Sequence, residues 1–148
     1  MAKGEETLQA IRVLMKNLAS DVGLRFDKTL GASFRCTMRS QTAIHRFHFD
    51  GADLKAFQAN RAVRNKIKKR LEDELDCLRM KEKIKQAAAP LYPDQELGFG
   101  RYDRNGEVRV EVAPPRTGSI YWAMGADELT ALEKLHTKIK RAARMCSP

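Results

Sequence analysis

The spacing of hydrophobic residues predicts most of the secondary structure, because it alternates between a helical period and a period of two. Near the start of the chain, apolar side chains recur every three or four positions, which predicts an amphipathic helix that Gly23 ends in a left-handed cap. The apolar positions of this helix are Leu8, Ile11, Met15, Leu18 and Val22. From Leu24 to Phe49 the period is two, which predicts an antiparallel meander of three strands. The residues expected on its buried side are Leu24, Phe26, Phe34, Cys36, Met38, His45, Phe47 and Phe49.

Helical spacing returns between Gly51 and Pro90 and predicts one long, charge-rich helix. Acids at Asp50 and Asp53 favour its start, and Pro90 prevents its continuation. The buried stripe of this helix comprises Leu54, Phe57, Val63, Ile67, Leu71, Leu75 and Leu78.

Many charges in this helix have an opposite charge four residues away, so they neutralise one another on the next turn. Such pairs are Lys68 with Glu72, Lys69 with Asp73, and Arg70 with Glu74. The cations without an acid at helical spacing are Arg61, Arg64 and Lys66. The first half of the helix is therefore the half expected to contact phosphate.

Beyond Pro93 the strand pattern resumes with Leu97, Phe99 and Arg101, and the Asn105-Gly106 pair predicts a tight hairpin. The hairpin's second strand would bury Val108, Val110 and Val112, and a further strand would turn Ile120, Trp122 and Met124 toward the core. A last helix follows from Ala126 to Met145. Its buried stripe is Leu129, Leu132, Leu135 and Ile139.

These elements predict an α+β fold: N-terminal helix, three-stranded antiparallel meander, long central helix, second three-stranded antiparallel meander and C-terminal helix. A chain of 148 residues is long enough for one compact domain over 1–148. Two lobes, 1–89 and 90–148, that share the central helix are the alternative.

The charge balance favours a polyanionic partner, with 28 Lys and Arg against 19 Asp and Glu and a net charge of +9. Three cysteines without CxxC spacing argue against a disulfide framework and a zinc site, and fit a reducing, cytoplasmic compartment. The chain shows neither a signal peptide nor an apolar stretch that could span a bilayer, so no membrane partner is expected.

The polar side of the first meander is the most specific feature, because it would collect charges of one sign. Thr37 lies between the cations of this side, and Asp27 and Asp50 are the acids expected there. The cationic residues of this side are Arg25, Arg35, Arg39, Arg46 and His48. A different strand register would scatter these cations over both sides of the sheet. The other structural alternative is that acids of the long helix cover them.

The last helix has a second cationic stripe, without acids in register to pair it. Its members are Lys134, Lys138, Arg141 and Arg144. The helix macrodipole is a structural reason for Arg141 and Arg144, because cations are favoured near a helix C-terminus.

Catalytic and metal-binding signatures are absent: the sequence has no HExxH, P-loop, GxGxxG or GxSxG motif. His45 is expected in the core, and His136 beside the buried stripe of the last helix. His48 and Asp50 share a strand face and could form an acid–base or metal pair, whereas His45 points to the opposite side. Gly98 and Gly100 predict a bulge or a close packing contact, and no cofactor or metal is expected.

Two resemblances rest on element order. Helix, three strands, helix over Glu5 to Ala89 is similar to double-stranded-RNA-binding domains, and three strands then a helix over Glu96 to Met145 looks like the arm-type DNA-binding domains of integrases. The first family usually has a histidine in its first strand turn and a lysine cluster opening its final helix. Here that turn is Gly31-Ala32-Ser33 and the helix opens Ala52-Asp53-Leu54-Lys55, so no functional residue is transferred.

The expected function is that of a small basic protein without catalytic activity, which binds DNA or RNA mainly through backbone phosphates. The alternative is a small regulator or inhibitor of the phage or mobile-element type that docks an acidic protein partner. A metal-dependent nuclease is the third class, although its candidate acids show no metal-site spacing. Those acids are Asp27, Asp50, Glu107 and Glu111.

Overall fold

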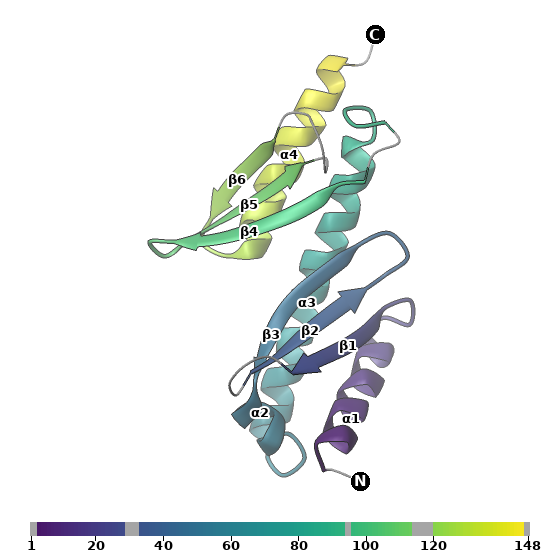
Figure 1. The fold of residues 1–148 in the computed structure, drawn as a ribbon, viewed down its shortest axis with the longest axis vertical. Coiled ribbons are helices and arrows are strands. Elements are labelled where there is room, and N and C mark those ends of the chain that lie inside the picture. Colours follow the sequence, from purple (N-terminus) through teal and green to yellow (C-terminus); the bar gives the residue numbers. More distant parts are fainter. Residues whose placement is uncertain (1–2, 29–32, 94–95, 114–119, 147–148) are drawn as a thin grey trace. The chain divides into compact units, whose positions relative to one another are not determined.

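The computed structural model (Figure 1) describes residues 3–28, 33–93, 96–113 and 120–146. Its elements confirm the predicted α+β fold, with two three-stranded antiparallel sheets and a long central helix. In chain order they are α1 (Lys3–Leu18), β1 (Gly23–Lys28), β2 (Ser33–Arg39), β3 (Ile44–Asp50), α2 (Gly51–Ala56), α3 (Arg61–Ala88), β4 (Gly98–Arg104), β5 (Glu107–Ala113), β6 (Tyr121–Gly125) and α4 (Glu128–Cys146).

The chain divides into two compact units, Met1–Leu78 and Arg79–Pro148, with the boundary inside α3. The single domain and the two lobes suggested by the sequence stay predictions. Within the described ranges, no helix combines the length and the apolar composition that a bilayer crossing requires.

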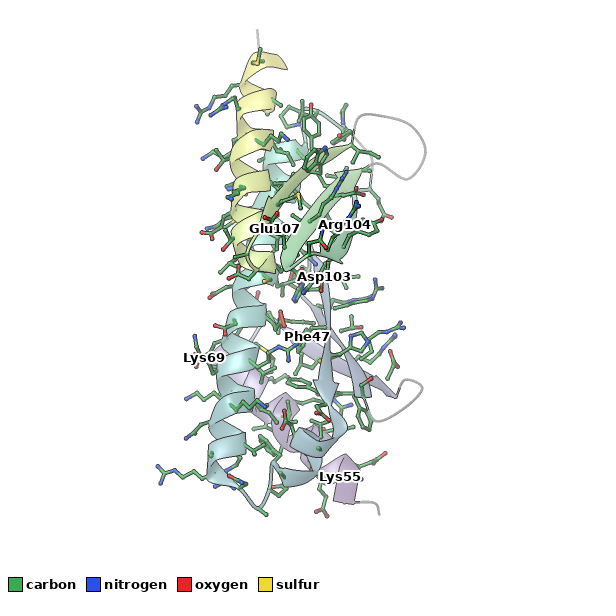
Figure 2. The ribbon with its side chains drawn as sticks, turned by 90° about the vertical axis from the view of Figure 1, so that its left-hand side faces the viewer. Phe47, Lys55, Lys69, Asp103, Arg104 and Glu107 are labelled. Atoms are coloured by element: carbon green, nitrogen blue, oxygen red, sulfur yellow. The ribbon has the colours of Figure 1, made fainter. Side chains whose placement is uncertain are left out.

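The first unit buries one face of the sheet β1-β2-β3 against helices, as the alternating pattern predicts. Figure 2 shows Phe47 between the sheet and α3, and Lys69 on the opposite side of that helix. This core includes Ile11 and Met15 of α1, Cys36, Met38, Phe47 and Phe49 of the sheet, and Ile67, Leu71 and Leu78 of α3.

The single helix predicted from Gly51 to Pro90 is wrong, because α2 ends at Ala56 and α3 begins only at Arg61, after a turn. Asn60 causes the restart: its Oδ1 accepts from the backbone N–H of Ala62 (2.9 Å) and of Val63 (3.3 Å). Asn is a favoured N-cap, since its side chain satisfies amides that lack a helical partner. The predicted start is confirmed, since Asp50 Oδ1 caps the Ala52 amide at 3.0 Å.

Gly23 is also not the helix cap that the sequence predicted. Helix α1 ends at Leu18, and Gly23 is the first residue of β1. Among the described glycines only Gly106 has a positive φ, so Gly23 does not adopt the left-handed conformation. A turn closed by the Val22 amide and the Ala19 carbonyl (3.2 Å) makes the reversal instead.

The second unit contains the sheet β4-β5-β6 and helix α4. The predicted hairpin is confirmed: Asn105 (φ 53°) and Gly106 (φ 79°) both take the positive φ values that a type I′ turn requires. The valines at 108, 110 and 112 are buried, as are Leu132, Leu135 and Ile139 of α4. Gly98 and Gly100 pair regularly with Ala113 and Glu111, so β4 has no bulge at these positions.

The orientation predicted for the last strand is wrong. Ala123 pairs with Val110 and Gly125 with Val108, which puts Ala123 and Gly125 on the buried side, whereas Trp122 is 40% exposed. Close packing explains the choice: a Cβ on Gly125 would lie 2.7 Å from the backbone nitrogen of Ala131 in α4. Small residues must therefore face this helix, and the bulky ones turn outward.

Candidate nucleic-acid interface

The strand register of the first unit gathers a cationic surface on the outer side of its sheet. Thr37 pairs with Arg25 on one side and with Arg46 on the other, and the next row holds Asp27, Arg35 and His48. Antiparallel partners project to the same side, so these residues lie opposite the core. We call this surface the arginine face; its members are Arg25, Arg35, Arg39, Arg46 and His48.

Few acids compensate the arginine face. Arg25 bonds Asp27 at 3.1 Å in an exposed pair, which contributes little to stability. In the part of the chain that the structure describes, Arg35, Arg39 and Arg46 form no ion pair with an acid. Helix α3 packs on the inner side of the sheet, so its acids do not cover this surface.

Thr37 occupies the middle of the arginine face and is 6% exposed, yet its Oγ1 has no hydrogen-bond partner. A buried hydroxyl without a partner costs about 1–3 kcal/mol, so such atoms are uncommon in folded proteins. The oxygen is covered by its neighbours, so a ligand bound from solvent does not reach it in this conformation. The sequence identified Thr37 only as a polar residue among cations.

The cations predicted at the start of α3 do not join the arginine face, because that helix lies on the other side of the sheet. Arg64 Nη1 donates to the carbonyl of Gln58 at 2.8 Å. Lys66 Nζ bonds Asp53 at 3.0 Å, so Lys66 is not an unpaired cation. Helical spacing missed this pair because the acid lies 13 positions earlier, before the turn that separates α2 from α3. Arg61 is exposed.

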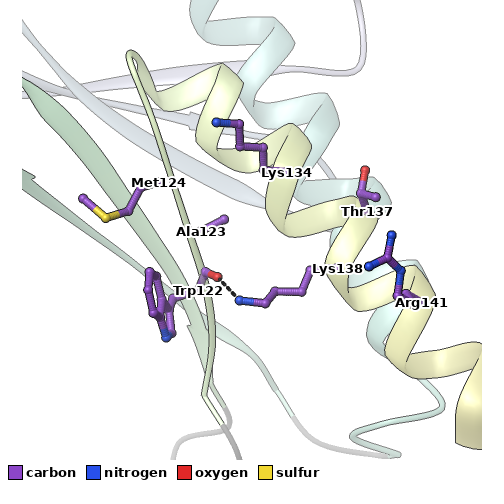
Figure 3. A pocket seen from close by; sticks show the side chains of 7 residues that line it. All are labelled: Trp122, Ala123, Met124, Lys134, Thr137, Lys138 and Arg141. Carbon is purple, nitrogen blue, oxygen red and sulfur yellow. Dashed lines mark hydrogen bonds between the residues drawn. The ribbon is translucent and has the colours of Figure 1, made fainter.

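Three of the cations predicted on α4 line a groove of about 360 Å³ beside β6 (Figure 3). Lys138 reaches across it and donates to the Trp122 carbonyl at 3.0 Å, the dashed line in Figure 3. Its ammonium also lies 4.9 Å from the centroid of the Trp122 ring. The groove-lining cations are Lys134, Lys138 and Arg141; Arg144 is exposed but does not line the groove.

The outer side of the second sheet holds aromatic residues that the sequence did not identify as site residues. Tyr102 is 56% exposed on β4, and Trp122 is exposed on β6. Between these strands, Arg109 of β5 holds its guanidinium carbon 4.3 Å from the Trp122 ring centroid. The Asn105-Gly106 hairpin could have identified Tyr102, because a two-residue turn fixes the register and therefore which β4 residues share a face with Arg109.

His45 is fully buried, which confirms its predicted place in the core. Its Nε2 lies 2.9 Å from Glu74 Oε1, and Arg70 Nε donates to Glu74 Oε2 at 2.9 Å. Burial raises the pKa of Glu74, but the hydrogen bonds and charges of His45 and Arg70 outweigh it and hold that pKa below 4.5. The sequence missed this partner of His45 because it lies 29 positions away.

The same region contains atoms that suit a metal by type. The ligand atoms of His45, Glu74 and Cys77 lie within 4.8 Å of one another, and this donor set is compatible with zinc. Both Glu74 oxygens already accept hydrogen bonds, one from His45 and one from Arg70. In the described ranges no third ligand gathers around His48 and Asp50, and Asp50 caps α2.

No protein-family model matches the chain, and no curated protein sequence matches it either. Inferences about function therefore depend on the geometry of its surfaces.

Proposed function

We propose that the protein binds DNA or RNA through backbone phosphates and performs no chemistry on them. The observation that supports this proposal is the arginine face, where Arg25 alone among its described cations has an acidic partner. Guanidinium forks match phosphate oxygens and form charge-assisted hydrogen bonds with them.

The sheet geometry suits this ligand. Neighbouring strands lie about 4.8 Å apart, so Arg25 and Arg46 start roughly 10 Å from each other with Thr37 midway. A phosphate above this row can accept from both guanidiniums. The contacts involve the backbone alone, so they predict affinity without strong sequence preference.

A salt titration with two charge-matched variants tests the proposal. Arg35→Glu with Arg46→Glu should abolish binding to duplex and single-stranded probes, because both side chains belong to the arginine face. Wild-type affinity should fall with a log-log salt slope of about −0.9 per phosphate contact on duplex DNA. Thermal unfolding should change little, since exposed charges add little to stability.

The matched control is Lys55→Glu with Lys68→Glu, two exposed lysines outside the arginine face. Each exchange removes one positive and adds one negative charge, so both double variants fall from +9 to +5. The control should retain binding. Equal losses in the two variants would show that net charge alone attracts the ligand, and a flat salt profile would reject phosphate contacts.

The same probes test the absence of catalysis. We expect intact probes after incubation with Mg²⁺ or Mn²⁺, because no group of three potential metal ligands forms around His48 among the described residues. Metal-dependent cleavage that His48→Ala abolishes would establish a nuclease instead. Binding to an acidic protein, with no affinity for any nucleic-acid probe at low salt, would establish the regulator alternative.

A further inference from the structure

The outer side of β4-β5-β6 presents flat side chains to solvent. One row across this sheet holds Tyr102, Arg109 and Met124, and the next holds Gly100, Glu111 and Trp122. All of them lie opposite the buried valines of β5, because paired residues project to the same side. Two large aromatic residues on one exposed sheet face differ from scattered surface apolar residues, which need no explanation.

Tyr102 leans along its own strand over Gly100. A Cβ on Gly100 would lie 3.4 Å from Tyr102 Cε2 and 3.6 Å from its hydroxyl oxygen, so the ring occupies the space above that glycine. The absence of a side chain there lets the ring approach the sheet. Because Tyr102 is still 56% exposed, it has an open surface on which another planar group can stack.

Arg109 and Trp122 form a second flat surface. The guanidinium covers the indole at 4.3 Å, and Glu111 holds Arg109 Nη2 at 2.9 Å. Arg109 Nε is shielded from solvent and has no hydrogen-bond partner. Nucleobases stack on guanidinium planes as well as on aromatic rings, so this pair is a stacking surface whose guanidinium charge is paired with Glu111.

The groove beside Trp122 supplies the complement for a charged backbone. Lys134, Lys138 and Arg141 line it, and none of the described lining residues is an acid (Figure 3). Stacking surfaces next to a cationic groove are the combination by which proteins hold unpaired nucleic acid strands. In a duplex the base faces are stacked on each other and inaccessible, so duplexes cannot use both features.

We propose that the second unit binds single-stranded nucleic acid, with bases stacked on Tyr102 and on Arg109 above Trp122. Phosphates of the same strand bind Lys134, Lys138 and Arg141 in the groove. This inference rests on the proposed function, which gives nucleic acid as the class of ligand. It adds that the nucleic acid is single-stranded and that it binds a site outside the arginine face.

The test uses the intrinsic fluorescence of the 148-residue chain, which has a single tryptophan, Trp122. An oligothymidylate should change this fluorescence as it binds. An abasic oligonucleotide of the same length offers the same phosphates without bases, so it should bind more weakly and leave the fluorescence nearly unchanged. A duplex of equal length should also fail to change it.

The deciding variant is Tyr102→Leu, which keeps an apolar side chain and removes the stacking surface. It should weaken oligothymidylate binding roughly 5- to 150-fold, the effect of losing one base–aromatic stack, and leave abasic binding unchanged. The matched control is Ile120→Ala, which removes an exposed apolar side chain without a π face and should leave both affinities unchanged.

The outcomes separate this inference from the proposed function. Equal affinity for the abasic and the base-bearing strands, together with an unchanged Tyr102→Leu variant, would overturn the stacking site and leave phosphate binding intact. Absence of binding to every oligonucleotide at low salt would overturn both. Polyglutamate that alters the Trp122 fluorescence as strongly as oligothymidylate would show a general polyanion groove and reject the stacking site.

Discussion

Replacing Glu74 should lower the free energy of unfolding of the first unit, and the size of the loss tests its buried contacts. Its side chain is 10% exposed and accepts from His45 on one oxygen and from Arg70 on the other. Glu74→Ala removes the acceptor of both and leaves the His45 ring fully buried without it. Breaking a buried pair by removing one partner costs about 3–5 kcal/mol. Arg70 is 42% exposed and can turn toward solvent, so we expect the lower end, about 3 kcal/mol.

The neighbouring residue provides the control. Asp73 bonds Lys69 at 2.8 Å with the same i,i+4 spacing on the same helix, but these side chains are 55% and 70% exposed. Asp73→Ala should therefore change the free energy of unfolding much less, because water replaces the lost partner. Urea denaturation followed by far-UV circular dichroism measures both variants. Equally small losses would refute the buried network as a source of stability.

The pH dependence follows from the pKa of Glu74, which the folded state holds below its usual value of 4.5. The unfolded chain binds a proton to this carboxyl at a higher pH than the folded chain does. Its contribution is therefore complete above pH 4.5 and is lost as the pH falls through the folded-state pKa. The unfolding free energy of Glu74→Ala should vary less with pH over this range than that of the wild type. Parallel profiles would contradict the assigned ion pair.

Two further predictions concern cysteine reactivity and glycine packing. Burial, with the nearby Glu74 charge, raises the pKa of Cys36 to about 12, so iodoacetamide at neutral pH should modify it only after unfolding, as measured by mass spectrometry of its peptide. Rapid modification in the folded state would contradict this burial. Gly125→Ala should lower the free energy of unfolding by about 1–3 kcal/mol, because the new Cβ would overlap the backbone of α4. Gly23→Ala is its control, since nothing lies within 4 Å of the added atom, and equal urea midpoints for the two variants would contradict the packing argument.

Features that depend on neighbours a few residues away follow from the sequence alone. The order of helices and strands follows from the period of the apolar residues. The Asn105-Gly106 turn follows from residue type, because Asn and Gly tolerate the positive φ values that a type I′ turn requires. Asp50 caps α2 for an equally local reason, because its side chain reaches an amide two residues on. The arginine face was predictable to the same extent, since strand alternation puts its members on one side.

Tertiary structure decided the features that need a partner distant in sequence. Alternation alone does not say which face of β6 is buried. The close approach of α4 at Gly125 buries the face with Gly125 and turns Trp122 outward. His45 meets Glu74 only when β3 packs on α3, and the unpartnered Thr37 hydroxyl arises only when β2 lies between two cationic strands. The stacking surfaces of the second unit belong to this group as well. A strand's period defines two faces, but which of them is buried depends on what packs against it.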